Sequence, residues 1–217
     1  MKHGTSRQLH AYWTRLRGNE PAPQRGAIDP KDIRQILSET LILEVVKGGP
    51  LRFRLAGTGL CSVFCQELQG KDFLALWSEP DRHLMAGGVE SALAETTPVI
   101  FEFVGSNDRG QEVAFEGLLL PLLHLRPPAD RLIGSLSALS QPYWLGTLPI
   151  VRQRLNALRL LRGERTPLLR RRTDWPSFKP PAVLPQRPIP APAPPPSQKP
   201  SPPARRAAFT VFEGGKR

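Results

Sequence analysis

The order of secondary-structure patterns between residues 40 and 138 constrains this 217-residue chain more than any single motif does. Two short segments alternate apolar and polar residues, as strands with one buried face do. Their apolar positions are Leu41, Leu43, Val45, Leu51, Phe53 and Leu55. Residues 47–50 (Lys-Gly-Gly-Pro) separate the two segments, and glycine adopts the backbone angles of a tight turn without steric cost. The pattern therefore predicts an antiparallel hairpin.

Helical patterns follow this hairpin, and three more strand patterns follow the helices. Residues 58–68 and 79–95 carry apolar residues at helical spacing, with a short turn at residues 71–77 between them. The segments that then alternate as strands are residues 99–103, 113–119 and 132–138. Glu44, Glu102 and Glu116 are interpreted as the solvated side of the sheet. The order predicts an α+β fold with helices on one face of a five-stranded antiparallel sheet.

Two helices are expected before the hairpin. Ser6 can cap a helix that stops at Gly18, and the aromatic residues on this helix require a partner surface. Asp29 and Pro30 favour the start of a shorter helix at residues 31–37. Residues 1–27 are therefore expected to form an N-terminal flanking helix and loop.

The positive charge of the chain lies in its last third. Residues 1–150 contain 15 Lys and Arg against 16 Asp and Glu, whereas residues 151–217 contain 15 basic and 3 acidic residues. A pI near 10.6 suggests nucleic-acid or membrane binding when the charge is spread over a whole protein. Here it describes a basic appendage on a nearly neutral domain, which we expect to span residues 28–146.

The basic appendage divides into two parts. Residues 147–172 combine leucines at helical spacing with arginines, which predicts a basic amphipathic helix that packs on a protein surface or contacts an anionic partner. The candidate contact residues are Arg152, Arg154, Arg159, Arg162, Arg170, Arg171 and Arg172. Residues 173–217 are rich in proline and are expected to be a disordered or extended tail.

The sequence contains no recognisable targeting or metal-binding pattern. Its first residues do not resemble a signal peptide, and the longest apolar run, residues 117–123, is too short to cross a bilayer. A cytoplasmic protein is therefore expected. Cys61 and Cys65 lack a second pair of ligands at suitable spacing, so we interpret them as buried thiols and predict no metal site.

Four segments of the sequence resemble a known family. Tyr12-Trp13 with Leu16-Arg17, Ile28-Asp29-Pro30, the run LRFRLAGT at residues 51–58, and Leu76-Trp77 are similar to a proteobacterial family of short, mostly stand-alone PAS proteins. The resemblance covers roughly residues 8–140, and the order of strands and helices looks like a PAS domain. Cys65-Gln66 and Leu41 depart from the residues expected at those positions. The resemblance implies signal sensing or protein docking and does not by itself imply catalysis.

A PAS domain would place its ligand pocket among apolar residues between the helices and the sheet. The candidate lining residues are Phe53, Leu55, Phe64, Phe73, Trp77, Phe101, Phe103 and Phe115. Haem is disfavoured because His83 lies nearly opposite the apolar side of its helix. A flavin adduct is disfavoured because neither cysteine lies in an Asn-Cys-Arg-like motif. No Ser, His and Asp arrangement supports catalysis, so no enzyme is expected.

Two functions therefore stay open at the level of the sequence. In the first, the chain is a non-catalytic sensory or regulatory module of a bacterial cell, which binds a small molecule, a protein partner or a second copy and signals through its flanking helices. In the second, the domain is a scaffold, and the arginine-rich segment binds nucleic acid or an anionic membrane surface.

Overall fold

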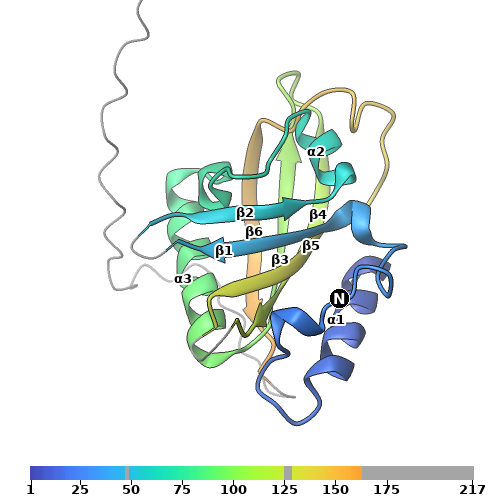
Figure 1. The fold of residues 1–217 in the computed structure, drawn as a ribbon. Helices are drawn as coiled ribbons and strands as arrows, with labels where there is room; N and C mark the ends of the chain where they lie inside the picture. Colours follow the sequence, from blue (N-terminus) through green and yellow to red (C-terminus); the bar gives the residue numbers. More distant parts are fainter. Residues whose placement is uncertain (47–48, 125–128, 163–217) are drawn as a thin grey trace, which may run out of the picture. The chain divides into compact units, whose positions relative to one another are not determined.

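All six strands of the described chain lie in one antiparallel sheet. The computed structural model describes residues 1–46, 49–124 and 129–162, so the expectations for Arg170, Arg171, Arg172 and the proline-rich segment lie outside the described residues. The strands are β1 (Thr40–Val45), β2 (Leu51–Ala56), β3 (Val99–Ser106), β4 (Glu112–Leu122), β5 (Arg131–Ala138) and β6 (Arg152–Leu160). Their order in the sheet is β2-β1-β5-β4-β3-β6 (Figure 1).

In the described part of the chain, α2 and α3 lie between the first two strands and the last four, in the order that the sequence predicted. The α-helices are α1 (Gly4–Arg17), α2 (Thr58–Phe64) and α3 (Glu79–Glu95), and the 3-10 turns are η1 (Arg25–Ala27), η2 (Leu37–Glu39) and η3 (Phe73–Leu76). The α+β architecture, the five predicted strands and the long helix α3 are confirmed.

The prediction of a basic helix at residues 147–172 is wrong where the structure describes it, because residues 152–160 form the edge strand β6 beside β3. The register shifts between Glu102 and Phe103, which leaves Asn156 as an extra residue on β6. Leu155 and Leu158 are three residues apart, and the bulge allows both to face the same side of a strand. A spacing that is typical of a helix is therefore also compatible with a bulged strand.

Three helix boundaries differ from the predictions. His3, not Ser6, caps α1: its Nδ1 accepts from the amide of Thr5 at 3.3 Å, while Ser6 is buried inside the helix. Helix α2 ends at Phe64, because Cys65 adopts a left-handed conformation with φ 47°. The expected helix at residues 31–37 is not formed: residues 31–36 form successive turns, and Leu37 begins η2.

Two hydrophobic clusters lie on the two faces of the sheet, and we call these faces inner and outer. The inner cluster packs α2, η3 and α3 against the sheet and contains Phe73, Met85 and Val89. The outer cluster packs α1 against β4 and β5 and contains Leu9 and Trp13. Figure 1 shows α1 and α3 on separate sides of the strands. The sequence predicted helices on one face, whereas the N-terminal flanking helix covers part of the other.

Candidate functional site

The predicted pocket residues on the inner face form a continuous cluster of aromatic rings. Phe53 meets Phe73 at 5.6 Å between ring centroids, and Phe73 meets Trp77 at 6.0 Å. Trp77 meets Phe103 at 5.2 Å, and Phe103 stacks on Phe115 at 4.7 Å. Phe64 and Phe101 belong to the same buried cluster. The structure therefore brings seven of the eight candidates together in one cluster, and the rings of all but Phe64 pack on one another.

Gly117 makes room for one of these rings. A Cβ added at Gly117 would come within 2.1 Å of the ring of Phe101, so the ring lies directly over the glycine backbone. The space beside the Gly117 backbone is thus filled by a neighbouring side chain. The indole N–H of Trp77 is buried in this cluster and has no hydrogen-bond partner among the described residues.

Leu55 is the exception among the predicted lining residues. The pairing of β1 with β2 shifts between Ile42 and Leu43, so that Leu43 pairs with Phe53 and Ile42 pairs with Leu55. The bulge at Arg54 breaks the alternation, and Leu55 is 41% exposed. Its placement in the pocket is therefore wrong, because one extra residue moves a side chain to the other face of a strand.

The candidate ligands for a metal or a haem are dispersed. His83 is exposed, as predicted, and its Nδ1 lies 2.8 Å from the carbonyl oxygen of Glu79 one turn earlier. Cys65 is exposed and Cys61 is half-buried, so the prediction of two buried thiols is wrong. Within residues 1–46, 49–124 and 129–162, no three His, Cys, Asp or Glu side chains gather as they would around a metal ion.

The outer face carries a buried carboxylate that the sequence pattern did not predict. Glu116 is fully buried, and its carboxylate accepts hydrogen bonds from the amides of Lys2 at 2.5 Å and His3 at 3.0 Å. His3 is the N-cap of α1, and Lys2 precedes it. At the start of a helix, unsatisfied N–H groups and the helix dipole favour a negative charge. The interpretation of Glu116 as a solvated residue is therefore wrong, because α1 covers this part of the outer face.

The surroundings of Glu116 favour its charged form. Burial alone would raise the pKa of this carboxyl, but the favourable interactions together, first among them the hydrogen bonds from the Lys2 and His3 amides, outweigh it and hold the pKa below the usual value. Lys2 also pairs with Glu102 at 2.7 Å, and His3 lies 3.7 Å from Glu39. The start of α1 is thus fastened to the sheet by charged and polar contacts. We call the hydrogen bonds of the Glu116 carboxylate to the amides of Lys2 and His3 the Glu116 latch.

The middle of α1 is fastened differently. The indole N–H of Trp13 donates to the carbonyl oxygen of Pro121 in β4 at 2.7 Å, and the Trp13 side chain is buried. The hydroxyl of Tyr12 accepts from the amide of Asp29 at 2.9 Å. The resemblance to PAS proteins singled out Tyr12-Trp13 and Asp29, and the structure places them in contact.

A sequence signal for this covered outer face did exist. After Glu116, residues 117–123 are Gly-Leu-Leu-Leu-Pro-Leu-Leu, which leaves no polar position for a solvated side. A strand that is apolar at every position is typically buried on both faces. Leu118, Leu120 and Leu122 do belong to the outer cluster.

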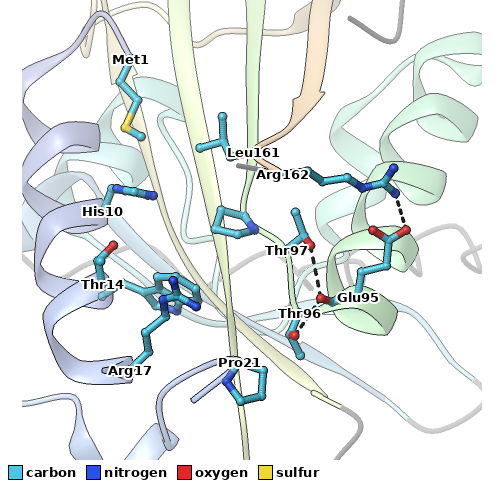
Figure 2. Close-up of a pocket in the computed structure, with 12 residues that line it drawn as sticks. Met1, His10, Thr14, Arg17, Pro21, Glu95, Thr96, Thr97, Leu161 and Arg162 are labelled. Atoms are coloured by element: carbon cyan, nitrogen blue, oxygen red, sulfur yellow. Dashed lines mark hydrogen bonds and ion pairs between the residues drawn. The ribbon is translucent and has the colours of Figure 1, made fainter. Parts of the chain in front are cut away.

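A groove of about 600 Å³ opens beside α1. One wall consists of His10, Trp13, Thr14 and Arg17 on α1 together with Pro21, as Figure 2 shows for the labelled residues among them. The opposite wall is formed by residues 95–98, which join α3 to β3, and by Leu161 and Arg162 after β6. Leu161 donates its amide to the carbonyl oxygen of Pro98 at 2.8 Å, which holds the end of the sheet against this connection.

The charges of the groove are unequal on its two sides. Arg162 pairs with Glu95 on the far wall (Figure 2). On the α1 side, the guanidinium of Arg17 lies over the Trp13 ring at 5.3 Å. Arg17 has no carboxylate partner in the part of the chain that the structure describes, and its only hydrogen bond there is a 3.4 Å contact to the carbonyl oxygen of Glu20. Burial, and secondly Arg17, lower the pKa of His10, so its imidazole is uncharged at neutral pH.

The candidate arginines in the described part of the tail lie on or just after β6. In the register with β3, Arg152, Arg154 and Arg159 alternate with the inward-facing Gln153, Leu158 and Leu160. Arg152 and Arg154 are exposed, and Arg154 donates to the side chain of Asn156 at 3.1 Å. These arginines thus share the outer face of an edge strand, whereas Arg162 belongs to the groove.

A comparison with models of protein families identifies the family of this chain. Residues 1–137 match the family described as PAS domain, and since this is more than half of the chain, the chain belongs to the PAS domain family. Among solved structures, it is similar to one titled "Structure of RsLOV d2 variant", with 16% identity, coverage of 54% of this chain and 71% of that chain, and a TM-score of 0.39. No curated protein matches the sequence.

Membership of this family fixes the class of the protein as a PAS domain, a class of generally sensory modules. The fold is an antiparallel PAS sheet with six strands, where five were predicted. No helix in the described part of the chain is long and apolar enough to span a bilayer.

Proposed function

We propose that this chain is a non-catalytic sensory or regulatory module that transmits a signal by changing how α1 sits on the outer face of the sheet. The observation that carries the proposal is the Glu116 latch, which ties the start of α1 to the sheet through a buried carboxylate and two backbone amides. A helix held in this way has two distinct arrangements, docked and released, and a ligand or partner that favours one shifts the population between them.

Release of α1 would uncover a surface that suits a protein partner. Leu9, Tyr12 and Trp13 are all buried against the sheet in the docked arrangement. A released amphipathic helix binds an apolar groove of another protein through such residues, and the uncovered outer face offers a second docking surface. The partner is therefore a protein or a second copy of the chain.

The packed inner cluster supports α1 as the moving part. Six aromatic rings of the inner face contact one another in a chain, and each is at most 3% exposed. Movement there would break many contacts at once, because interiors are packed to the density of organic crystals. Movement of α1 exchanges the hydrogen bonds of the Glu116 latch for hydrogen bonds to water.

Native-state hydrogen exchange tests the proposal directly. If α1 is a releasable element, the amides of Leu9 to Trp13 exchange through an opening that costs less free energy than the opening of β3, β4 and β5. Equal protection of α1 and the central strands, with exchange by global unfolding alone, would contradict it.

A second candidate function rests on the exposed arginines of β6. Arg152 and Arg154 lie on one side of an edge strand, and cations placed in this way favour contacts with phosphate groups. The test uses a chain that ends at Arg162, because this chain keeps all six strands. Its binding to a 20-base-pair DNA duplex and to phosphatidylserine vesicles is measured at several salt concentrations. Binding that is strong at low salt, weakens steeply as salt is added and requires Arg152 and Arg154 would favour this second function over the first.

A further inference from the structure

The inner face of the sheet is filled by its own aromatic side chains, so a ligand site is more readily formed elsewhere in the described structure. The groove beside α1 is the strongest candidate, because its walls come from three separate parts of the chain. Its volume of about 600 Å³ lies within the range of small-molecule sites.

The groove has an apolar part and a cationic part. Trp13, Pro21, Pro98 and Leu161 supply apolar walls, and Arg17 supplies a guanidinium that no described carboxylate neutralises. The Arg162 charge on the other wall is balanced by Glu95. The local charge next to Trp13 is therefore positive. The uncharged imidazole of His10 has one ring N–H, which can donate a hydrogen bond to an anion.

We propose that this groove binds a small amphipathic carboxylate. The carboxylate pairs with the guanidinium of Arg17, and the apolar body lies between Trp13 on α1 and Pro98 and Leu161 on the opposite wall. Arginine suits this role because its planar, permanently charged group forms paired hydrogen bonds with carboxylates.

The position of the groove gives such a ligand a defined effect. It would contact α1 on one side and the α3–β3 connection and the end of β6 on the other. A molecule that bridges the two sides holds α1 in its docked arrangement, since it binds that arrangement better than the released one. This effect rests on the proposed function, whereas binding itself does not.

The experiment uses 2-naphthoate as the carboxylate probe and 2-naphthylmethanol as its neutral isostere. Both are titrated into the full-length, isotope-labelled chain, and binding is followed by NMR at the amides of His10, Thr14, Thr97 and Leu161. We expect 2-naphthoate to shift these four signals with one binding constant and to bind about tenfold more tightly than the alcohol, as a charge-assisted hydrogen bond provides.

Arg17→Met and Arg15→Met form a matched pair of variants. Both arginines lie on α1 and stack on an aromatic ring, Arg17 on Trp13 at 5.3 Å and Arg15 on Tyr12 at 5.4 Å. Of these two arginines, Arg17 lines the groove and Arg15 does not; Arg15 lies 3.6 Å from Asp32. Arg17→Met should weaken 2-naphthoate binding about tenfold and leave the alcohol unchanged, whereas Arg15→Met should change neither.

A third variant, Thr14→Phe, fills the groove from an exposed position of α1 and should abolish binding of both probes. Binding that survives Thr14→Phe, equal effects of Arg15→Met and Arg17→Met, or signal changes at Trp77 in place of the groove residues would overturn the site. If 2-naphthoate binds in the groove but hydrogen exchange of α1 is unchanged, the binding site stands and the proposed signalling through α1 fails. If nothing binds while α1 still opens separately, the site fails and the proposed function stands.

Discussion

The two faces of the sheet are covered by different kinds of contact. On the inner face, rings from β2, β3, β4 and η3 interlock, and the cluster also includes Met85 and Val89 of α3. On the outer face, α1 adds apolar contacts of its own but begins at a buried carboxylate, and an open groove runs along its side. The difference teaches that one sheet can be covered by interlocked rings on one face and, on the other, by a helix whose start is held through polar contacts.

The largest effect is expected on the inner face, from Phe103→Ala. The ring of Phe103 contacts Trp77, Phe101 and Phe115, and its loss leaves a cavity in the cluster. We expect the free energy of unfolding to fall by about 3–5 kcal/mol. Denaturation in urea measures this loss, and a loss below about 1 kcal/mol would show that the inner cluster is loosely packed, contrary to the comparison.

Gly117→Ala tests how closely the same cluster is packed. The new Cβ would clash with the Phe101 ring, so we expect a loss of about 3 kcal/mol from overpacking. In the background of Phe101→Leu the clash is smaller, and the second substitution should cost clearly less. Equal costs in both backgrounds would mean that the ring and the glycine do not interact.

On the outer face, Glu116→Gln should remove the charge of the latch while keeping its shape. We expect a loss of about 1.5 kcal/mol, since hydrogen bonds to a charged group exceed those to a neutral one by roughly this amount. Glu102→Gln is the matched control, because Glu102 pairs with the Lys2 side chain and is partly exposed. It should cost less than about 0.5 kcal/mol.

The same carboxylate should give the outer face a pH dependence. The folded-state pKa of Glu116 lies below the ordinary value of 4.5, so its contribution to stability is complete above pH 4.5 and is lost as the pH falls through the folded-state pKa. The stability difference between the wild-type chain and Glu116→Gln should therefore be constant from pH 7 to 5 and shrink at lower pH. A difference that grows on acidification would contradict the assigned direction of the shift.

A small effect is expected for Leu55→Ala, a variant that tests whether Leu55 faces away from the inner cluster, as the bulged strand places it, or towards it, as simple alternation predicted. Leu55 is 41% exposed on the edge strand β2, so its removal should cost less than about 1 kcal/mol. Phe53→Ala, two residues earlier and buried, should cost about 3–5 kcal/mol. Similar losses for the two variants would show that Leu55 faces the inner cluster after all.

The inner face could be predicted from the sequence almost completely. Alternation in β3 and β4 placed Phe101, Phe103 and Phe115 correctly, because the alternating pattern maps onto one buried face. The errors arose where a single extra residue breaks the alternation. Bulges at Arg54 and Asn156 moved Leu55 out of the cluster and made β6 look like a helix.

The outer face was predicted poorly for a different reason. Its site depends on contacts between residues more than 100 positions apart, as in the pairing of Lys2 and His3 with Glu116. No local spacing encodes such a contact. The groove likewise joins α1 to Pro98 and Leu161, which only the assembled sheet brings together.

The most direct measurement of the central claim is ¹⁹F NMR of the chain labelled with 5-fluorotryptophan. The chain has four tryptophans, and the variants Trp13→Phe and Trp77→Phe identify the signals of these two residues among the four. Trp13 reports on α1 and the outer face, and Trp77 reports on the inner cluster. We predict that Glu116→Gln shifts or splits the Trp13 signal towards that of the unfolded chain and leaves the Trp77 signal unchanged. Equal changes at both residues, or none at Trp13, would contradict a releasable helix on a rigid sheet.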